Sequence, residues 1–426
     1  MPIRRLLVAN RGEIALRVFR TCRALGIETV AVAAPDDLGS LHARSADERV
    51  EIASYLQPEE HIRAARQAGA DAIHPGYGFL AESGDFAEAV EAAGLSWVGP
   101  SPEALRLGGD KIAAKRVARE AGVTVLPDGD PESIGFPLLV KAAAGGGGRG
   151  MRVVRSAAEL EDALEAAERE ARGAFADGTL YLERYLERPR HVEVQLLADG
   201  RGAVVAVGER DCSVQRRHQK VLEEAPAPRL SPDLRSALHR AAESFGQAIG
   251  YRSAGTVEFV LDGDEFFFLE LNGRIQVEHP VTEAVTGLDL VAEQLRIASG
   301  EPLTIPRHQP NGHAVEVRLY AEDPRSFLPQ AGRIDVLELP CDTVSHGPSR
   351  VRVDAGVEEG DEVGTAYDPM IAKLVAHGPA RDDALDALAA ALAETRVEGV
   401  MTNLPFLRWL VAHRVVRAGE ATTAFL

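Results

Sequence analysis

Short apolar runs and amphipathic stretches alternate along residues 1–105. Between the first two apolar runs, a helical stripe of apolar side chains leads from Ile14 to Leu25 and is closed by Gly26. Strands that alternate with helices in this way predict a doubly wound parallel sheet. Ligands of such sheets bind beyond the carboxyl ends of the strands. The expected strands are at residues 6–9, 29–33, 71–74 and 96–99, and loops 10–13 and 74–78 follow two of them.

The next part of the chain predicts a small lobe. Residues 99–102 break the strand–helix pattern, a helix is expected at 111–121, and the turn-rich residues 127–131 indicate a hinge. The lobe itself follows as a strand, a glycine run, a second strand, a helix and a returning strand. These are expected at residues 137–141, 145–150, 151–154, from 156, and 180–183.

Strands dominate from about residue 187 onward. Residues 191–196 alternate between apolar and polar side chains, which is typical of a half-buried strand. One long helix is expected from Ser231 to Gly250, because a capping serine followed by Pro232 is a helix start. The leucines at 385, 388 and 392 mark a late helix. The chain is therefore predicted to be a multidomain α/β and α+β protein with a strand-rich C-terminal part.

Composition narrows the functional classes. The 426 residues carry a net charge of −18, which argues against a general nucleic-acid binder. A local basic cluster at 215–220 still allows an anionic substrate. No apolar run approaches the roughly 20 residues that span a bilayer, and no signal peptide is evident, so a cytoplasmic protein without membrane contact is expected. Three widely separated cysteines indicate neither a disulfide framework nor a zinc site.

The glycine run at 145–150 formally satisfies a dinucleotide-binding fingerprint. That fingerprint must open a helix, whereas here a strand follows, so the run predicts a hairpin. No glycine loop ends in the Lys-Ser/Thr of a P-loop. A hairpin with many free N–H groups could cover a triphosphate, with Lys141 beside it; a plain surface loop is the alternative.

Two acidic residues stand in neighbouring aromatic strands. The segments 255–260 and 267–272 flank a turn at 262–264, so they predict an antiparallel hairpin. Glu258 then lies near Glu270, with Asn272 on the same face as Glu270. Buried carboxylates and an amide oxygen suit Mg²⁺ that is bound to phosphate oxygens. The alternative is a solvent-facing set, which the surrounding phenylalanines disfavour.

The loop after the second strand concentrates polar groups. Arg274, Gln276, Glu278 and His279 lie within a few residues of each other, next to the expected metal–nucleotide site. A cation, an amide and a carboxylate in this place predict activation of a small oxyanion. His191, His218 and His279 lack the spacing of zinc ligands.

Several segments closely resemble the biotin carboxylases, in order over essentially the whole chain. They are residues 10–15, 74–82, 141–154, 209–220, 274–283 and 367–370. The resemblance implies an N-terminal domain at 1–108, an ATP-grasp domain at 109–310 with a lid at about 126–186, and a C-terminal domain at 311–426. A glycine at position 273, where the family often has threonine, is a departure beside the metal site.

The resemblance also implies residue roles. Glu278 matches the general base that deprotonates bicarbonate, Arg318 the arginine that stabilises the biotin enolate, and Tyr77 a residue near the biotin ring. The other bicarbonate contacts are implied at Lys220, Arg274, Gln276 and the backbone of Val277. The metal ligands for Mg²⁺ or Mn²⁺ are implied at Glu258, Glu270 and Asn272. The ATP contacts are implied at Lys111, Lys141, Gly146, Gly147, Met151, Glu183, Leu186, His191, Gln215 and His218.

The implied reaction is ATP-dependent carboxylation of carrier-bound biotin by bicarbonate. No Met-Lys-Met acceptor pattern surrounds Lys373, and no carboxyltransferase region is present. The biotin carboxyl carrier protein and the carboxyltransferase are therefore expected as separate chains. A homodimer is expected, with Arg20 on the first helix as one contributor. Two alternatives stay open: another ATP-grasp ligase, of the carbamoyl-phosphate or purine type, and a non-catalytic ATP-binding subunit.

Overall fold

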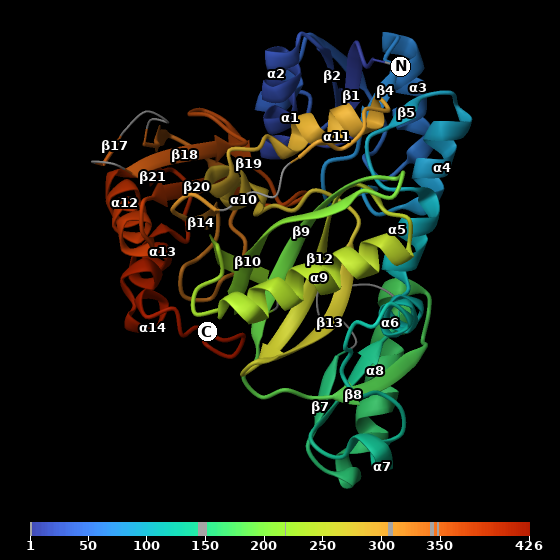
Figure 1. Cartoon of the computed structure of the whole chain (residues 1–426). Helices are drawn as coiled ribbons and strands as arrows, with labels where there is room; N and C mark the ends of the chain where they lie inside the picture. Colours follow the sequence, from blue (N-terminus) through green and yellow to red (C-terminus); the bar gives the residue numbers. More distant parts are fainter. Residues whose placement is uncertain (1, 144–150, 218, 306–309, 341–344, 347–348) are drawn as a thin grey trace.

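The N-terminal part of the computed structural model is a parallel sheet with helices on both faces (Figure 1). The structure describes residues 2–143, 151–217, 219–305, 310–340, 345–346 and 349–426. The strand order is β3-β2-β1-β4-β5. The strands are β1 (Arg5–Val8), β2 (Glu28–Ala33), β3 (Glu48–Glu51), β4 (Ala72–His74) and β5 (Ser96–Trp97). The helices are α1 (Gly12–Leu25), α2 (Leu41–Ser45), α3 (Pro58–Ala68), α4 (Gly84–Ala92), α5 (Pro102–Gly109) and α6 (Lys111–Glu120).

Strand β1 shows why this sheet is buried on both sides. Leu6 and Val8 pack into one apolar cluster. Leu7 and Ala9 pack into another. Alternate residues of a strand point to opposite faces, so a run without polar side chains fits a sheet that helices cover twice. The doubly wound sheet is thereby confirmed, and Gly26 ends α1 in the left-handed conformation with φ of 71°.

A small lobe extends away from the N-terminal sheet at the lower end of Figure 1. Its antiparallel sheet has the order β7-β6-β8 and encloses its own apolar cluster. The two arms expected for the glycine hairpin pair antiparallel, with Leu138 opposite Val154, and the glycine run itself lies outside the described residues. The lobe contains β6 (Leu138–Ala142), β7 (Arg152–Val154), β8 (Leu180–Arg184), α7 (Pro131–Ile134), a 3₁₀ turn (Ala157–Glu159) and α8 (Leu160–Phe175).

One antiparallel sheet forms the centre of the molecule. Its order is β13-β12-β9-β10-β11-β14-β20-β18-β17. The boundary expected near residue 311 falls between β11 and β14, which are hydrogen-bonded neighbours. The central and C-terminal parts therefore share one sheet, which local patterns did not predict. The strands are β9 (Arg190–Asp199), β10 (Val204–Arg216), β11 (Gln219–Ala225), β12 (Arg252–Asp262), β13 (Glu265–Asn272), β14 (His313–Tyr320), β17 (Ser345–His346), β18 (Ser349–Ala355) and β20 (Met370–Gly378).

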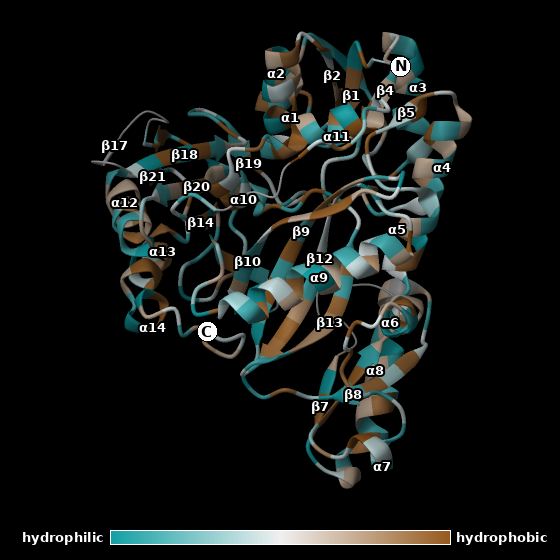
Figure 2. Cartoon of the chain, in the orientation of Figure 1, coloured by the Kyte–Doolittle hydropathy of each residue, from teal (hydrophilic) through white to brown (hydrophobic). Residues whose placement is uncertain are grey.

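Helices cover this sheet at both ends. Helix α9 (Pro232–Ala248), capped by Ser231 as expected, packs on β9 and β10. Figure 2 shows hydrophobic residues along β9, β12 and β13, whereas α9 has both kinds. Helix α12 (Arg381–Glu394) packs on β20 and β14 through the predicted leucines. The remaining elements are α10 (His279–Thr286), α11 (Leu290–Ala298), α13 (Leu404–Ala412), α14 (Arg414–Arg417), β15 (Gly332–Arg333), β16 (Val336–Glu338), β19 (Glu362–Val363) and β21 (Arg396–Glu398).

None of the helices in the described part of the chain has both the length and the apolar character that a membrane span requires.

Candidate active site

The two acids of the β12–β13 hairpin lie on one face of the central sheet. Phe259 pairs with Phe268, but the next pair is Glu258 with Glu270. Leu269 is therefore an extra residue, a β-bulge. Without this bulge Glu258 would lie opposite Leu269, and Glu270 would point to the other face. The bulge brings the two carboxylates together, as the hairpin predicted from the sequence requires.

A cavity of about 340 Å³ opens above these acids. It collects side chains from the small lobe, the central sheet, the loop after β13 and strand β14. Its lining includes most of the predicted site residues, namely Lys111, Lys141, Met151, His191, Gln215, Lys220, Glu258, Glu270, Asn272, Arg274, Gln276, Val277, Glu278 and Arg318. A larger cavity of about 930 Å³ lies beside α1 and α10 and contains none of these residues.

Lys220 is the centre of a buried charge network. Its Nζ lies 2.6 Å from Glu193, 2.9 Å from Glu258 and 2.6 Å from Glu278. Burial lowers the pKa of the ammonium group, but the three carboxylates outweigh that effect and raise the pKa well above its usual value. Lys220 is therefore a fixed cation, and it joins the hairpin acids to the loop after β13.

Glu278 lies at the start of α10 and is completely buried. Its Oε1 accepts from Lys220, and its Oε2 lies 3.0 Å from the Arg318 guanidinium. Burial raises the pKa of this carboxyl, but Lys220 and Arg318 more than offset it, so the pKa is lowered overall. Glu278 is thus ionised and held between two cations, one on each oxygen.

The hairpin acids differ in their electrostatic balance. Lys220 and His191 keep the pKa of Glu258 below its usual range despite burial. Burial, followed by repulsion from Glu258, raises the pKa of Glu270. A divalent cation between two such carboxylates would remove the repulsion, and both supply the oxygen ligands that Mg²⁺ prefers. In this structure the Asn272 amide donates to Glu258 at 2.8 Å, and its oxygen faces Arg274.

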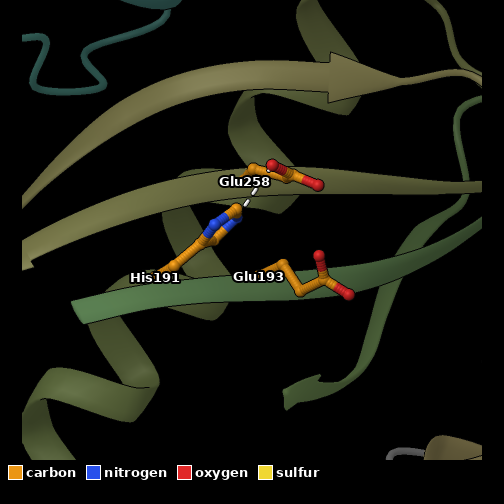
Figure 3. Close-up of side chains that lie close together, drawn as sticks. All are labelled: His191, Glu193 and Glu258. Atoms are coloured by element: carbon orange, nitrogen blue, oxygen red, sulfur yellow. Dashed lines mark ion pairs between the residues drawn. The ribbon is translucent and has the colours of Figure 1, made fainter. Parts of the chain in front are cut away.

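A second group of ligand-type atoms overlaps with this one. Figure 3 shows His191 and Glu193 on one strand and Glu258 on the neighbouring strand, with the His191 ring directed at the Glu258 carboxylate. The His191 Nε2 lies 2.8 Å from Glu258. Glu193 is already paired with Arg210 and Lys220. Because those partners occupy Glu193, the donor set around Glu258 and Glu270 fits a hard cation better.

Near the small lobe, Lys111 and Lys141 line the cavity, and Lys115 and Glu183 lie buried behind them. Glu183 pairs with Lys141 at 2.9 Å and also with Lys115. Lys115 was not predicted as a site residue, although it lies four residues after Lys111 on α6 and hence on the same helix face. Burial lowers the pKa of Lys111 even though Glu270 faces it. An anionic ligand such as a triphosphate would stabilise all three ammonium groups.

Comparison with known protein families decides between the alternatives. Residues 2–105 match the biotin carboxylase N-terminal domain, and residues 316–426 match the biotin carboxylase C-terminal domain. The chain belongs to the biotin carboxylase family. Residues 111–305 match the ATP-binding domain of the carbamoyl-phosphate synthase L chain, but both flanking matches are specific to biotin carboxylases.

Curated relatives extend over the whole chain. It is 46% identical to the biotin carboxylase of Halalkalibacterium halodurans and covers 97% of that protein. It is 48% identical to the mitochondrial methylcrotonoyl-CoA carboxylase subunit alpha of Arabidopsis thaliana. The chain spans 60% of that subunit's length.

Solved biotin carboxylase structures have the same fold. The biotin carboxylase domain dimer of Hydrogenobacter thermophilus 2-oxoglutarate carboxylase, in complex with MgADP, ADP and bicarbonate, superposes with a TM-score of 0.96 at 41% identity; the match covers 100% of this chain and 97% of that one. Rhizobium etli pyruvate carboxylase matches with a TM-score of 0.94 at 42% identity, over 100% of this chain and 40% of that one. The mixed α/β multidomain fold of a biotin carboxylase is thereby confirmed.

Some of the residues implied by the family lie outside the cavity. Tyr77, Glu183 and Leu186 do not line it, although Glu183 contacts Lys141, which does. Gly146, Gly147 and His218 lie outside the described residues. Four lining residues had been assigned no role from the sequence: Gln219, Leu269, Tyr320 and Asp368. Gln219 lies within the family-like segment 209–220, Asp368 within 367–370, and Tyr320 two residues after Arg318, so the resemblance was the signal that could have identified them.

The departure at position 273 has a packing explanation. A Cβ on Gly273 would lie 2.8 Å from Leu105 Cδ2 and 3.5 Å from Pro100. The threonine expected here from the resemblance would therefore require the end of the Leu105 side chain on helix α5 to shift. The glycine fits its neighbours, and the metal-side residues on either side remain at the cavity.

A second buried acid pair lies behind Arg318. Glu223 of β11 and Glu316 of β14 are direct cross-strand partners, and both are completely buried. Glu223 forms an ion pair with Arg318, whereas neither oxygen of Glu316 has a hydrogen-bond partner among the described residues. Burial raises the pKa of Glu223 to about 7 and that of Glu316 well above its usual value, although Lys373 and Arg318 act in the opposite direction on Glu316. The pair therefore binds protons at neutral pH.

This pair predicts a pH dependence of stability, of which Glu316→Gln removes the Glu316 contribution. The folded state binds the proton more tightly than the unfolded chain, so wild-type stability is lost as pH rises from about 4.5 through the raised pKa. Relative to wild type, the free energy of unfolding of the glutamine variant should rise by about 1.4 kcal/mol for each pH unit between about 4.5 and the raised pKa. Urea unfolding between pH 5 and pH 8 measures this. Glu362→Gln, on an exposed strand, is the control; parallel curves for wild type and Glu316→Gln would contradict the prediction.

Proposed function

We propose that this chain carboxylates biotin on a carrier protein, with ATP and bicarbonate as co-substrates and carboxyphosphate as the intermediate. The products are N1-carboxybiotin, ADP and phosphate. The observation that carries the proposal is the meeting of Glu258, Glu270 and Glu278 at one cavity, where Lys220 links Glu258 to Glu278. Such a site combines a metal–nucleotide end with an adjoining place for one small anion.

The nucleotide occupies the end near the small lobe in this proposal. Lys111 and Lys141 neutralise phosphate oxygens, with Lys115 adding positive charge from behind them, and Glu258 and Glu270, assisted by Asn272, hold Mg²⁺ or Mn²⁺. Bound between these carboxylates and the phosphates, the ion neutralises charge that develops during phosphoryl transfer. The Asn272 amide must rotate for its oxygen to take part, because it now donates to Glu258. Glycines 146 and 147, Met151, Leu186, His191, Gln215 and His218 complete the proposed ATP contacts.

Bicarbonate is proposed to bind beside Glu278, between Lys220, Arg274, Gln276 and the backbone of Val277. An arriving anion competes with Glu278 for Lys220. Lys220 and Arg318 lower the pKa of Glu278. When these cations also interact with bicarbonate, they stabilise the Glu278 carboxylate less, so Glu278 becomes more basic. Glu278 then takes the bicarbonate proton, and the oxyanion attacks the γ-phosphorus to give carboxyphosphate and ADP.

The second half of the reaction uses Arg318. Carboxyphosphate breaks into CO₂ and phosphate, and the phosphate removes the N1 proton of biotin. Arg318 stabilises the resulting enolate, which attacks CO₂ to give carboxybiotin. Arg318 lies 8% exposed at the cavity wall and contacts Glu278, so one arginine serves both halves. Tyr77 is proposed to lie near the biotin ring.

The small lobe is the proposed lid, at about residues 126–186 within an ATP-grasp domain at 109–310. Carboxyphosphate is vulnerable to water, so closure of a lid over the nucleotide would protect it. Domains at 1–108 and 311–426 would flank it.

The proposed partners are a biotin carboxyl carrier protein and a carboxyltransferase on separate chains. The Halalkalibacterium relative, a biotin carboxylase of nearly the same length, supports this arrangement. We also propose a homodimer, because the Hydrogenobacter neighbour is described as one. Arg20 of α1, which lines the larger cavity and pairs with Asp354, lies at a surface that a second copy could cover.

Phosphate release with single components omitted tests the function. Release should require ATP, Mg²⁺ and bicarbonate together, and free biotin should increase it. Release that ignores biotin would indicate another ATP-grasp ligase. ATP binding without turnover, even with the carrier supplied, would indicate a non-catalytic subunit.

A further inference from the structure

Lys373 is a completely buried lysine that the proposed mechanism does not use. It stands in the middle of β20, and its cross-strand partner on β14 is Arg318. Direct cross-strand partners point to the same face, so both side chains reach the same region from neighbouring strands. Burying an ammonium group costs free energy unless it forms hydrogen bonds and ion pairs, so the contacts of Lys373 indicate why it is buried here.

Those contacts join two separate parts of the molecule. The Lys373 Nζ donates to the carbonyl of Val277 at 2.8 Å. The same Nζ lies 3.2 Å from Oε1 of Glu13, in the first turn of α1. The same oxygen of Glu13 also accepts a hydrogen bond from the Tyr77 hydroxyl. A chain of contacts therefore runs from Tyr77 through Glu13 and Lys373 to Val277.

The Val277 carbonyl is next to the general base. It belongs to the peptide bond whose nitrogen is that of Glu278, so a fixed carbonyl fixes the backbone from which the Glu278 side chain departs. Arg318 holds the Glu278 carboxylate, and Lys373 holds its backbone. Both cations come from one cross-strand pair.

We propose that Lys373 is a positioning residue that couples the bicarbonate end of the site to the biotin end, through Val277 on one side and Glu13 with Tyr77 on the other. The inference rests on the proposed function for the identity of the two ends. A group that presses on Tyr77 shifts Glu13, and Glu13 shares Lys373 with the peptide of Glu278. Biotin bound near Tyr77 thereby adjusts the base that starts the reaction.

Glu316 of β14 also attracts Lys373, but neither of its oxygens bonds to the ammonium group, so charge compensation alone is a poorer account of these contacts. Asp354 of β18 is the cross-strand partner of Lys373 on its other side, but it pairs with Arg352 at 2.6 Å and with Arg20 at 3.0 Å. Lys373 instead reaches a neutral carbonyl and a carboxylate of another domain. A purely compensating lysine needs no contact with Val277.

The test compares Lys373→Met, Lys373→Arg and a control, Arg381→Gln. Arg381 also ties a buried sheet residue, Glu224, to the C-terminal part, but it lies outside the cavity. In Lys373→Met, bicarbonate-dependent ATP cleavage should fall about tenfold or more in kcat, and the increase caused by biotin should disappear. Lys373→Arg retains a cation and a hydrogen-bond donor, so it should retain part of the ATP cleavage rate and part of its increase by biotin. The melting temperature of the Arg381→Gln control should fall, but biotin should still increase its ATP cleavage. This increase is called the biotin response below.

A second variant covers the case in which Lys373→Met does not fold. Glu13→Gln keeps the shape and an acceptor for Tyr77 but removes the charge that holds Lys373. It should lower the biotin response more than it lowers cleavage without biotin. An unchanged biotin response in Glu13→Gln, or strictly additive effects of Tyr77→Phe and Lys373→Arg in a double-mutant cycle, would overturn the inference. Failure of the proposed function looks different, because wild type itself would then lack bicarbonate-dependent cleavage.

Discussion

Glu278→Gln should lose about 10²–10⁴-fold in bicarbonate-dependent ATP cleavage while it keeps ATP binding. The amide preserves the size of the side chain and can still contact Arg318, but it cannot accept the bicarbonate proton. The ATP contacts lie at the other end of the cavity, so nucleotide affinity should change little. Phosphate release at saturating bicarbonate, together with ATP titration by calorimetry, measures the two quantities separately.

The control for this variant is Glu224→Gln. Glu224 is also a buried glutamate held by cations, Arg381 and His313, but its side chain does not line the cavity. It should retain most of the activity. Full activity in Glu278→Gln would remove the general base from the mechanism, and equal losses in both variants would point to general damage of the sheet.

Glu270→Gln should lower turnover without lowering the stability of the metal-free protein. Burial and the nearby charge of Glu258 already disfavour the ionised form of Glu270, so a neutral amide should leave the metal-free protein as stable or more stable. Turnover should nevertheless fall by about 10²-fold or more, because one of the two proposed anionic ligands of the cation is lost. The melting temperature without metal tests the expected stability, and phosphate release as a function of Mg²⁺ concentration tests the expected loss of turnover. The Mg²⁺ concentration for half-maximal release should rise.

Glu265→Gln is the matched control on the same hairpin. Glu265 is exposed at the turn, where it pairs with Asp262 in the register. It should change neither the melting temperature nor the Mg²⁺ response. A Glu270→Gln variant with normal Mg²⁺ dependence would place the cation elsewhere, and the group around His191, Glu193 and Glu258 would then become the better candidate.

Local sequence patterns predicted the hairpin but not the detail on which its chemistry depends. The turn at 262–264 and the flanking aromatic residues give two antiparallel strands. The bulge at Leu269 decides which face Glu270 takes, and no turn residue or glycine marks it. Only the requirement that the acids share a face hinted at it.

Contacts between distant strands were beyond local reasoning altogether. Lys220 meets Glu193 and Glu278, which lie 27 and 58 positions away along the chain. Glu223 and Glu316 become neighbours only because β11 and β14 pair. Short-range periodicity predicts strands, whereas strand order depends on packing of the whole sheet. The family resemblance supplied most of the residues at the cavity, but not Lys115 or Glu223, the second partner of Arg318.

The pairing of β11 with β14 also bears on how the chain could be divided. A cut near residue 311 would leave β11 with a row of unmatched N–H and C=O groups along a strand that is buried in the intact molecule. Such an open edge invites association with other chains. The same cut would take Arg318 away from Glu278. Residues 311–426 are therefore no detachable module: the molecule needs them both to finish its largest sheet and to complete its reaction centre.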